Sequence, residues 1–106
     1  MKNRFLLVPL NDKGMEEYNF CIEDSKNILE KSLPISEYNL LVDNGIFDKF
    51  NEMFTLNISD YECEEIITEN LTKASEIIKP LADKLPVFVC CLNIAIEKGT
   101  LLGINL

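Results

Sequence analysis

The chain has 106 residues, a length that suits one domain, and 47% of them are apolar, which is enough to form a core. Its net charge of −8 argues against nucleic-acid binding, which uses basic surfaces, and fits a basic protein partner. No apolar run approaches the roughly 18 residues of a membrane span, and the N-terminus lacks a secretion-signal pattern. We therefore expect one globular domain, residues 1–106, in the cytoplasm and without membrane contact.

The first third of the chain predicts a strand followed by a helix. Arg4–Leu10, with the sequence RFLLVPL, is an apolar run of strand length, and Pro9 indicates a sheet edge or the end of the strand. A helix capped by Asn11 or Asp12 then continues to about Ser32, with one apolar and one charged side.

The next segment predicts short elements rich in aromatic residues. Ser36 can cap a helix over Glu37–Val42, which ends before a glycine, Gly45, that can adopt positive φ. The inward residues of this helix are Tyr38, Leu41 and Val42. Phenylalanines at helical spacing in 46–54 favour a turn or short helix, and the alternation in 54–58 favours a brief strand.

The segment Ile58–Leu81 has the clearest helical pattern. Ser59 and Glu62 form a capping box, in which each side chain bonds to the backbone N–H of the other residue. Apolar residues then recur every three or four positions and form one stripe, which predicts a long helix. The alternative is a strand over Tyr61–Ile67, followed by a shorter helix capped by Thr68.

Residues 86–106 predict a buried helix and a final strand. Pro86 suits the first turn of a helix, and Lys98 followed by Gly99 suits its end, although 87–91 also has strand propensity. Residues 100–106 predict a strand that pairs with the N-terminal one. The elements together predict an α+β fold, in which a small sheet that includes the N- and C-terminal strands packs against three or four helices.

The composition argues against an enzyme and against a cofactor or metal site. Histidine, the commonest general base, is absent. Four cysteines in apolar surroundings predict reduced core thiols rather than disulfides, nucleophiles or metal ligands: Cys21, Cys63, Cys90 and Cys91. A metalloprotein or enzyme that uses carboxylates alone is an alternative, because Glu62, Glu65 and Glu69 would share one side of a helix.

The densest charge cluster lies at the start of the central segment. Between positions 60 and 69 the chain has five acidic residues and no basic one. Such a cluster is either a solvated face or a surface that a basic partner recognises. The candidate partner-binding residues are Asp60, Tyr61, Glu62, Glu64, Glu65 and Glu69, with the tyrosine as an aromatic contact.

A small acidic chain without a catalytic motif resembles the immunity proteins of bacterial toxin systems. The resemblance involves the acidic cluster, Gly45-Ile46-Phe47-Asp48 and Glu97-Lys98-Gly99-Thr100. It implies a non-catalytic cytoplasmic protein whose acidic surface binds and neutralises a cognate toxin, often a nuclease. A structural or regulatory subunit that acts as a homodimer is the alternative.

Overall fold

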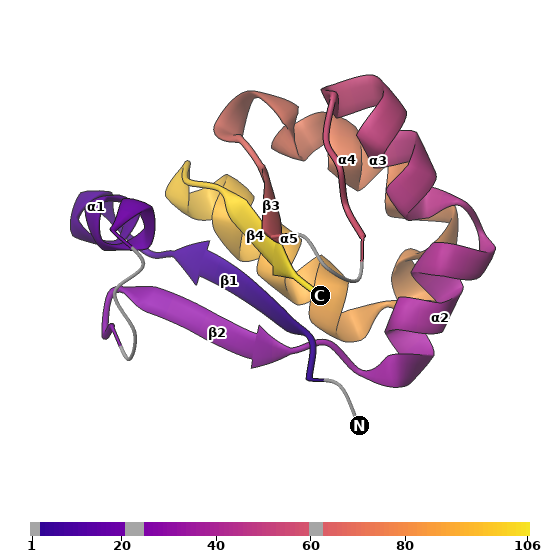
Figure 1. Cartoon of the computed structure of the whole chain (residues 1–106), viewed down its shortest axis with the longest axis horizontal. Helices are drawn as coiled ribbons and strands as arrows, with labels where there is room; N and C mark the ends of the chain where they lie inside the picture. The colour runs from indigo at the N-terminus through magenta and orange to yellow at the C-terminus, as the bar shows by residue number, and fades with distance from the viewer. Residues whose placement is uncertain (1–2, 21–24, 60–62) are drawn as a thin grey trace.

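The computed structural model describes residues 3–20, 25–59 and 63–106 and has an α+β fold (Figure 1). Its strands form one antiparallel sheet in the order β2-β1-β4-β3. They are β1 (Phe5–Pro9), β2 (Ile28–Ser32), β3 (Cys63–Ile66) and β4 (Leu102–Asn105). The pairing of the N- and C-terminal strands is confirmed, and it lies at the centre of the sheet. Pro9 therefore marks the end of a central strand and not a sheet edge.

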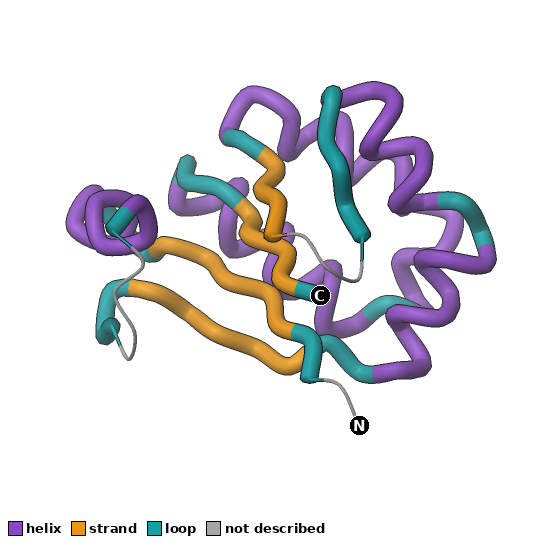
Figure 2. The backbone as a smooth tube through the Cα atoms, viewed as in Figure 1, coloured by secondary structure: helices purple, strands orange, loops and turns teal. Residues whose placement is uncertain are grey.

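The described residues contain five α-helices, and most of the helical chain lies on one side of the molecule, next to the sheet (Figure 2). The α5 helix runs behind the sheet, α2 and α3 lie beside it, and α1 lies at the far end (Figure 1). The helices are α1 (Asp12–Asn19), α2 (Ile35–Asp43), α3 (Ile46–Phe54), α4 (Leu71–Ile78) and α5 (Pro86–Lys98). Short 3₁₀ helices, Thr68–Asn70 and Lys79–Lys84, flank α4.

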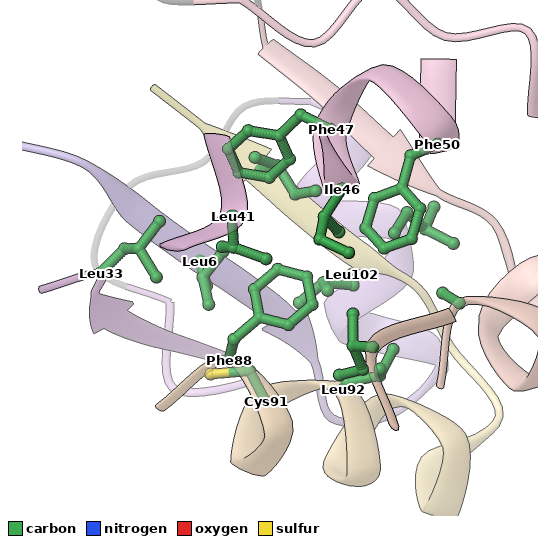
Figure 3. Close-up of a cluster of buried hydrophobic side chains, with 14 of the residues drawn as sticks. Leu6, Leu33, Leu41, Ile46, Phe47, Phe50, Phe88, Cys91, Leu92 and Leu102 are labelled. Atoms are coloured by element: carbon green, nitrogen blue, oxygen red, sulfur yellow. The ribbon is translucent and has the colours of Figure 1, made fainter. Parts of the chain in front are cut away.

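The core lies between one face of the sheet and helices α2 to α5 (Figure 3). Alternate strand residues point into it, as the period of two requires. These fully buried strand residues are Leu6, Val8, Ile66, Leu102 and Ile104. On the helical side, Phe50 of α3 stacks on Phe88 of α5 with ring centroids 6.3 Å apart.

The opposite face of the sheet is covered in part by α1. A Cβ atom at Gly103 of β4 would lie 2.8 Å from the Tyr18 hydroxyl oxygen, so the glycine makes room for the tyrosine ring. A Cβ atom at Gly14 would lie 2.1 Å from the Asn27 carbonyl oxygen, so a second glycine lets α1 approach the turn before β2. Asn11 caps α1 by accepting a 2.8 Å hydrogen bond from the Gly14 N–H group.

A buried carboxylate connects α2 to α5. Glu37 is only 3% exposed, and its two oxygens accept hydrogen bonds from the Val87 N–H at 3.0 Å and the Phe88 N–H at 2.8 Å. The α5 helix has no side-chain cap of its own, because the residue at the cap position, Leu85, has no side-chain acceptor. Pro86 has no N–H group, so the first backbone donors of the helix are those of Val87 and Phe88. Glu37 therefore supplies the cap from another helix, and its negative charge lies at the positive end of the helix dipole.

The helix predicted from residue 12 to about Ser32 is confirmed over Asp12–Asn19 and is wrong from Ser25 onward, whereas residues 21–24 lie outside the described parts of the chain. The described chain turns at Ser25, whose hydroxyl oxygen accepts a 3.0 Å hydrogen bond from the Asn27 N–H, and then enters β2. Small polar residues that bond to the nearby backbone favour turns over helices, and β2 gains ladder hydrogen bonds from β1.

The long helix predicted for Ile58–Leu81 is also wrong, and the alternative strand matches β3. β3 pairs with β4 along its whole length, and its last residue, Ile66, is β-branched and fully buried, which favours a strand. The Thr68 hydroxyl donates to the carbonyl oxygen of Thr100 and does not cap α4. In the predicted capping box, Glu62 lies outside the described residues.

Among the predictions for helix ends and short elements, some are confirmed and others are wrong. The α5 helix is confirmed, and Gly45 and Gly99 adopt positive φ angles of 67° and 66°. The α2 helix begins at Ile35, so Ser36 lies inside the helix and does not cap it. Residues 46–54 are helical, but 55–58 form no strand because the segment pairs with no neighbour in the described sheet.

Candidate protein-binding site

The described members of the predicted acidic cluster do not share one surface. Glu64 and Glu65 are consecutive in β3, so their side chains point to opposite faces of the sheet. Glu69 is exposed in the 3₁₀ turn that follows the strand. Asp60, Tyr61 and Glu62 lie outside the described residues. The single acidic face expected from a helix is therefore divided, because the segment is a strand.

Two of these carboxylates also interact within the fold. Glu64 accepts a 2.5 Å hydrogen bond from the Asn57 N–H, which ties the loop after α3 to β3. Burial, reinforced by the nearby charge of Glu64, raises the pKa of Glu65 above its usual value. Glu64 thus has a structural role, whereas Glu69 remains exposed to solvent.

A pocket lies between α2, α3 and the end of β4. We call it the α2–α3 pocket; its volume is about 240 Å³ and it is open to solvent. Its walls come from α2, the first turn of α3, the loop before β3 and the residue after β4. The described residues that line it are Tyr38, Val42, Phe47, Asp48, Ile58, Ser59 and Leu106.

The turn between α2 and α3 forms one side of the pocket. Gly45 adopts positive φ and separates the two helices, so Val42 from the end of α2 faces Phe47 and Asp48 from the start of α3. Asp48 lies in the first turn of α3, where the helix dipole favours its negative charge. The conformation of this turn therefore positions the charged residue of the pocket.

The loop before β3 forms the opposite side and is held in place by one amide. The Asn51 side chain accepts a 2.7 Å hydrogen bond from the Ile58 N–H and donates a 3.2 Å hydrogen bond to the Ile58 carbonyl oxygen. The Leu56 N–H also donates to the Asn51 carbonyl oxygen at 3.1 Å. This wall of the pocket is thus preorganised, which lowers the entropy cost of binding.

Tyr38 joins the pocket to the residue that precedes β1. The Arg4 guanidinium lies over the Tyr38 ring, 3.7 Å from its centroid, in a cation–π contact. The ring also contacts Phe47 with centroids 6.2 Å apart and an angle of 51° between the planes. These contacts fix the aromatic side of the pocket.

Exposed apolar side chains lie next to the pocket on α2. Ile35 is 57% exposed and Val42 is 45% exposed, and their separation of seven residues places them on one side of the helix. The prediction that Val42 faces the core is therefore wrong, and Tyr38 is only partly buried. Ile35, Val42 and Asp48 were missing from the predicted site. Exposure could not be read from the period alone, because α2 is apolar on more than one side.

The prediction that all four cysteines lie in the core is wrong for two of them. Cys91 is buried, but Cys63 and Cys90 are exposed, and Cys21 lies outside the described residues. Burial, reinforced by Cys90, raises the pKa of the Cys91 thiol to about 11. Among residues 3–20, 25–59 and 63–106, no group of three or more Cys, Asp or Glu side chains is arranged to hold a metal ion.

None of the helices in the described parts of the chain has both the length and the apolar character needed to cross a bilayer. In comparisons with protein-family models, curated proteins and solved structures, nothing matched this chain. The geometry of the α2–α3 pocket and its surroundings is therefore the basis for a functional proposal.

Proposed function

We propose that the chain is a non-catalytic binding protein that blocks a basic protein partner, as an immunity protein blocks its toxin. The observation that carries the proposal is the surface around the α2–α3 pocket. There the open pocket lies next to the exposed apolar side chains of α2, Ile35 and Val42, and to the acidic residue Asp48. Apolar contact area supplies binding energy, while charge complementarity guides the encounter and selects the partner. Such a role requires no turnover and places the protein where the toxin acts, in the cytoplasm.

The net charge of the chain supports a basic partner. At −8 the protein repels acidic molecules and attracts basic ones over the distances that screening allows. Ser59 lines the pocket and directly precedes Asp60 in the chain, which connects the pocket covalently to the predicted acidic residues. Asp60, Tyr61 and Glu62, which follow Ser59 in the chain, are therefore proposed as additional contacts, whereas Glu64 already holds the Asn57 N–H.

The test is to look for a neighbouring gene that ends in a basic, toxin-like domain and to co-express that domain with this chain. We expect the chain to restore growth, and the purified pair to associate more weakly as salt rises. Val42→Asp should weaken binding at least tenfold, because it places a charge in the apolar contact. Lys84→Asp, an exposed site outside the pocket, is the matched control. The proposal is wrong if the chain neither protects the cells nor binds that domain.

A homodimer is the second candidate, and the exposed stripe on α2 favours it. Ile35 and Val42 present apolar surface that a second copy would cover around a twofold axis. Sedimentation equilibrium separates the candidates, because a dimer gains mass with concentration and loses that gain in Val42→Asp. A strict monomer at millimolar concentration rules out the homodimer.

A further inference from the structure

We propose that the outer edge of β2 accepts an extended, basic strand of the partner, which pairs with it in the antiparallel sense and adds a further strand to the sheet. This inference rests on the proposed function for the nature of the partner, and it adds a contact made through the backbone. It is based on three properties of β2: the direction of its backbone groups, the charges along it, and its position beside α2.

The hydrogen bonds at the two ends of β2 show which of its residues face away from β1. The Leu33 N–H donates to the Arg4 carbonyl oxygen at 2.8 Å. The Leu10 N–H donates to the Asn27 carbonyl oxygen, also at 2.8 Å. In an antiparallel pair, residues that bond to the neighbouring strand alternate with residues whose backbone groups face the other side. The residues of β2 that face away from β1 are therefore Ile28, Glu30 and Ser32.

These outward groups form an open edge of the described sheet. β2 is an outer strand, as Figure 1 shows, and Glu30 and Ser32 are exposed. The Ile28 N–H already donates to the Ser25 carbonyl oxygen at 3.4 Å, so it is not part of the open edge. No part of the described chain bonds to the outward backbone groups of Glu30 and Ser32. An added strand would therefore replace water at these groups and displace no existing contact.

The charges on this edge argue against a second copy of the chain as the occupant. In the registers that use most of β2, pairing about a twofold axis places Glu30 opposite Glu30 or Lys31 opposite Lys31. Like charges that lie directly opposite each other destabilise a sheet, and natural edge strands use charged residues against self-association. A register centred on Leu29 would need the Ile28 N–H, which the Ser25 carbonyl oxygen already holds.

The same charges describe the strand that fits. A lysine or arginine opposite Glu30 makes a favourable cross-strand pair, and an apolar residue opposite Leu29 extends the side of β2 that packs against the core. The net charge of −8 attracts a basic segment to the chain. Addition of a strand to a sheet edge combines affinity from backbone hydrogen bonds with specificity from such side-chain pairs.

The position of β2 connects its edge to the surface around the α2–α3 pocket. β2 runs toward α2 in Figure 1, and only Leu33 and Pro34 separate it from Ile35, the first residue of α2. Ile35 is 57% exposed and belongs to the apolar side of α2 on which the proposed function depends. A partner strand on β2 and a partner contact on α2 therefore form one continuous interface.

The experiment uses the full isotope-labelled chain and an acetylated, amidated peptide, Lys-Thr-Glu-Lys-Val-Thr-Lys, as the probe. In the antiparallel register the middle lysine lies opposite Glu30, the glutamate opposite Lys31 and the valine opposite Leu29. In the free chain the Glu30 and Ser32 N–H groups should exchange with solvent at least about tenfold faster than those of Leu29 and Lys31, which bond to β1. With the peptide we expect saturable NMR shifts and slower exchange at Glu30 and Ser32.

Two methylated peptides separate backbone pairing from a loose attraction between charges. N-methylation of the middle lysine blocks its hydrogen bond to the Glu30 carbonyl oxygen and should weaken binding about tenfold. N-methylation of the glutamate is the matched control, because its N–H group faces away from β2, and it should change binding by less than about twofold. This comparison uses the unmodified chain and does not depend on how a variant folds.

A pair of variants makes the same test from the side of the chain. Glu30→Pro removes an N–H group that points away from β1, and proline is tolerated at such a position of an edge strand. It should weaken binding of the peptide at least about tenfold. Glu30→Gln keeps the N–H group and removes only the charge, so it should weaken binding about two- to threefold.

The inference is overturned if the peptide gives no saturable shift, if the shifts lie away from β2, or if the two methylated peptides bind equally. Protection of Glu30 and Ser32 that rises with the concentration of the chain alone would also overturn it, because the occupant would then be a second copy. Growth protection is measured separately. Protected cells with a failed peptide experiment contradict only the strand inference, whereas peptide binding without protection contradicts only the proposed function.

Discussion

Glu37 and Asp48 are acidic residues in consecutive helices, yet they lie in opposite settings. Glu37 is 3% exposed, and two backbone N–H groups of α5 occupy its carboxylate oxygens. Asp48 is exposed in the first turn of α3 and lines an open pocket. One carboxylate thus holds two helices together, whereas the other faces the space that a partner would fill.

The difference shows that the number of acidic residues does not locate a binding surface. A buried carboxylate that accepts two hydrogen bonds from a helix N-terminus stabilises the fold and cannot contact a partner. Glu64 resembles Glu37 in this respect, because it accepts the Asn57 N–H. We therefore expect the acidic residues of this chain to separate by experiment into those that change stability and those that change binding.

The largest expected effect is on stability, from Glu37→Ala. The substitution leaves the N–H groups of Val87 and Phe88 without an acceptor in a buried place, which should lower the free energy of unfolding by about 2–4 kcal/mol. Urea denaturation followed by circular dichroism measures it. Glu37→Gln retains one acceptor oxygen and should lose about half as much. A loss below about 1 kcal/mol for the alanine variant would mean that the cap contributes little.

The second expected effect is on binding, from Asp48→Asn. Titration with the toxin-like partner should show an affinity about three- to tenfold lower at low salt, with a difference that shrinks as salt rises. The free energy of unfolding should change by less than about 1 kcal/mol, because asparagine keeps a polar group at the helix start. If the stability falls as far as in Glu37→Ala, the contrast between the two carboxylates is wrong.

The parts of the fold that could be predicted are those whose signals are local. Pro86 and Gly99 mark the two ends of α5 within its own sequence, and Gly45 marks the turn before α3. The strands at the two ends of the chain were recognisable as dense apolar runs. The α+β class followed from these elements, because strands that begin and end the chain with helices between them lead to one sheet with helices packed against it.

The edge strands were harder to predict, because their stability comes from distant partners: β2 was assigned to a helix, and β3 was given only as the alternative strand over Tyr61–Ile67. β2 and β3 have helix-compatible sequences, and each becomes a strand by pairing with β1 or β4. The helix predicted for Ile58–Leu81 would have placed Glu65 and Glu69 on one side. Because Glu65 lies in β3 and Glu69 in the 3₁₀ helix after it, that reason for grouping them no longer holds. The α2–α3 pocket was missed because its lining comes from four separate parts of the chain, from α2 to the residue after β4.

The third prediction extends the contrast between buried and exposed groups to adjacent thiols. Cys90 is exposed and Cys91 is buried, with its thiol pKa raised to about 11, so little thiolate forms at Cys91 near neutral pH. With iodoacetamide at about pH 8, Cys90 and Cys63 should be alkylated at least tenfold faster than Cys91 in the native protein. Peptide mass spectrometry resolves the sites, and alkylation in urea is the control that should remove the difference. Equal rates in the native protein would contradict the burial of Cys91.

The smallest expected effect concerns Glu65, which lies between the two extremes. Burial and the charge of Glu64 raise its pKa, so folding disfavours the ionised form. The native state then binds more protons than the unfolded state, and the free energy of unfolding decreases as pH rises through the interval between the two pKa values. Above that interval the penalty is complete, and below it the penalty disappears.

Glu65→Gln removes this ionisable group and makes the sign testable. At pH 7 the variant should be more stable than the unmodified chain by about 0.3 kcal/mol, because the side chain is only partly buried and water screens most of its charge. Near pH 3 the two proteins should be equally stable. Glu69→Gln, at an exposed position on the same segment, is the matched control for the removal of one carboxylate. A variant that is less stable at pH 7 than at pH 3, relative to the unmodified chain, would mean that Glu65 stabilises the fold as an ion and belongs with Glu37.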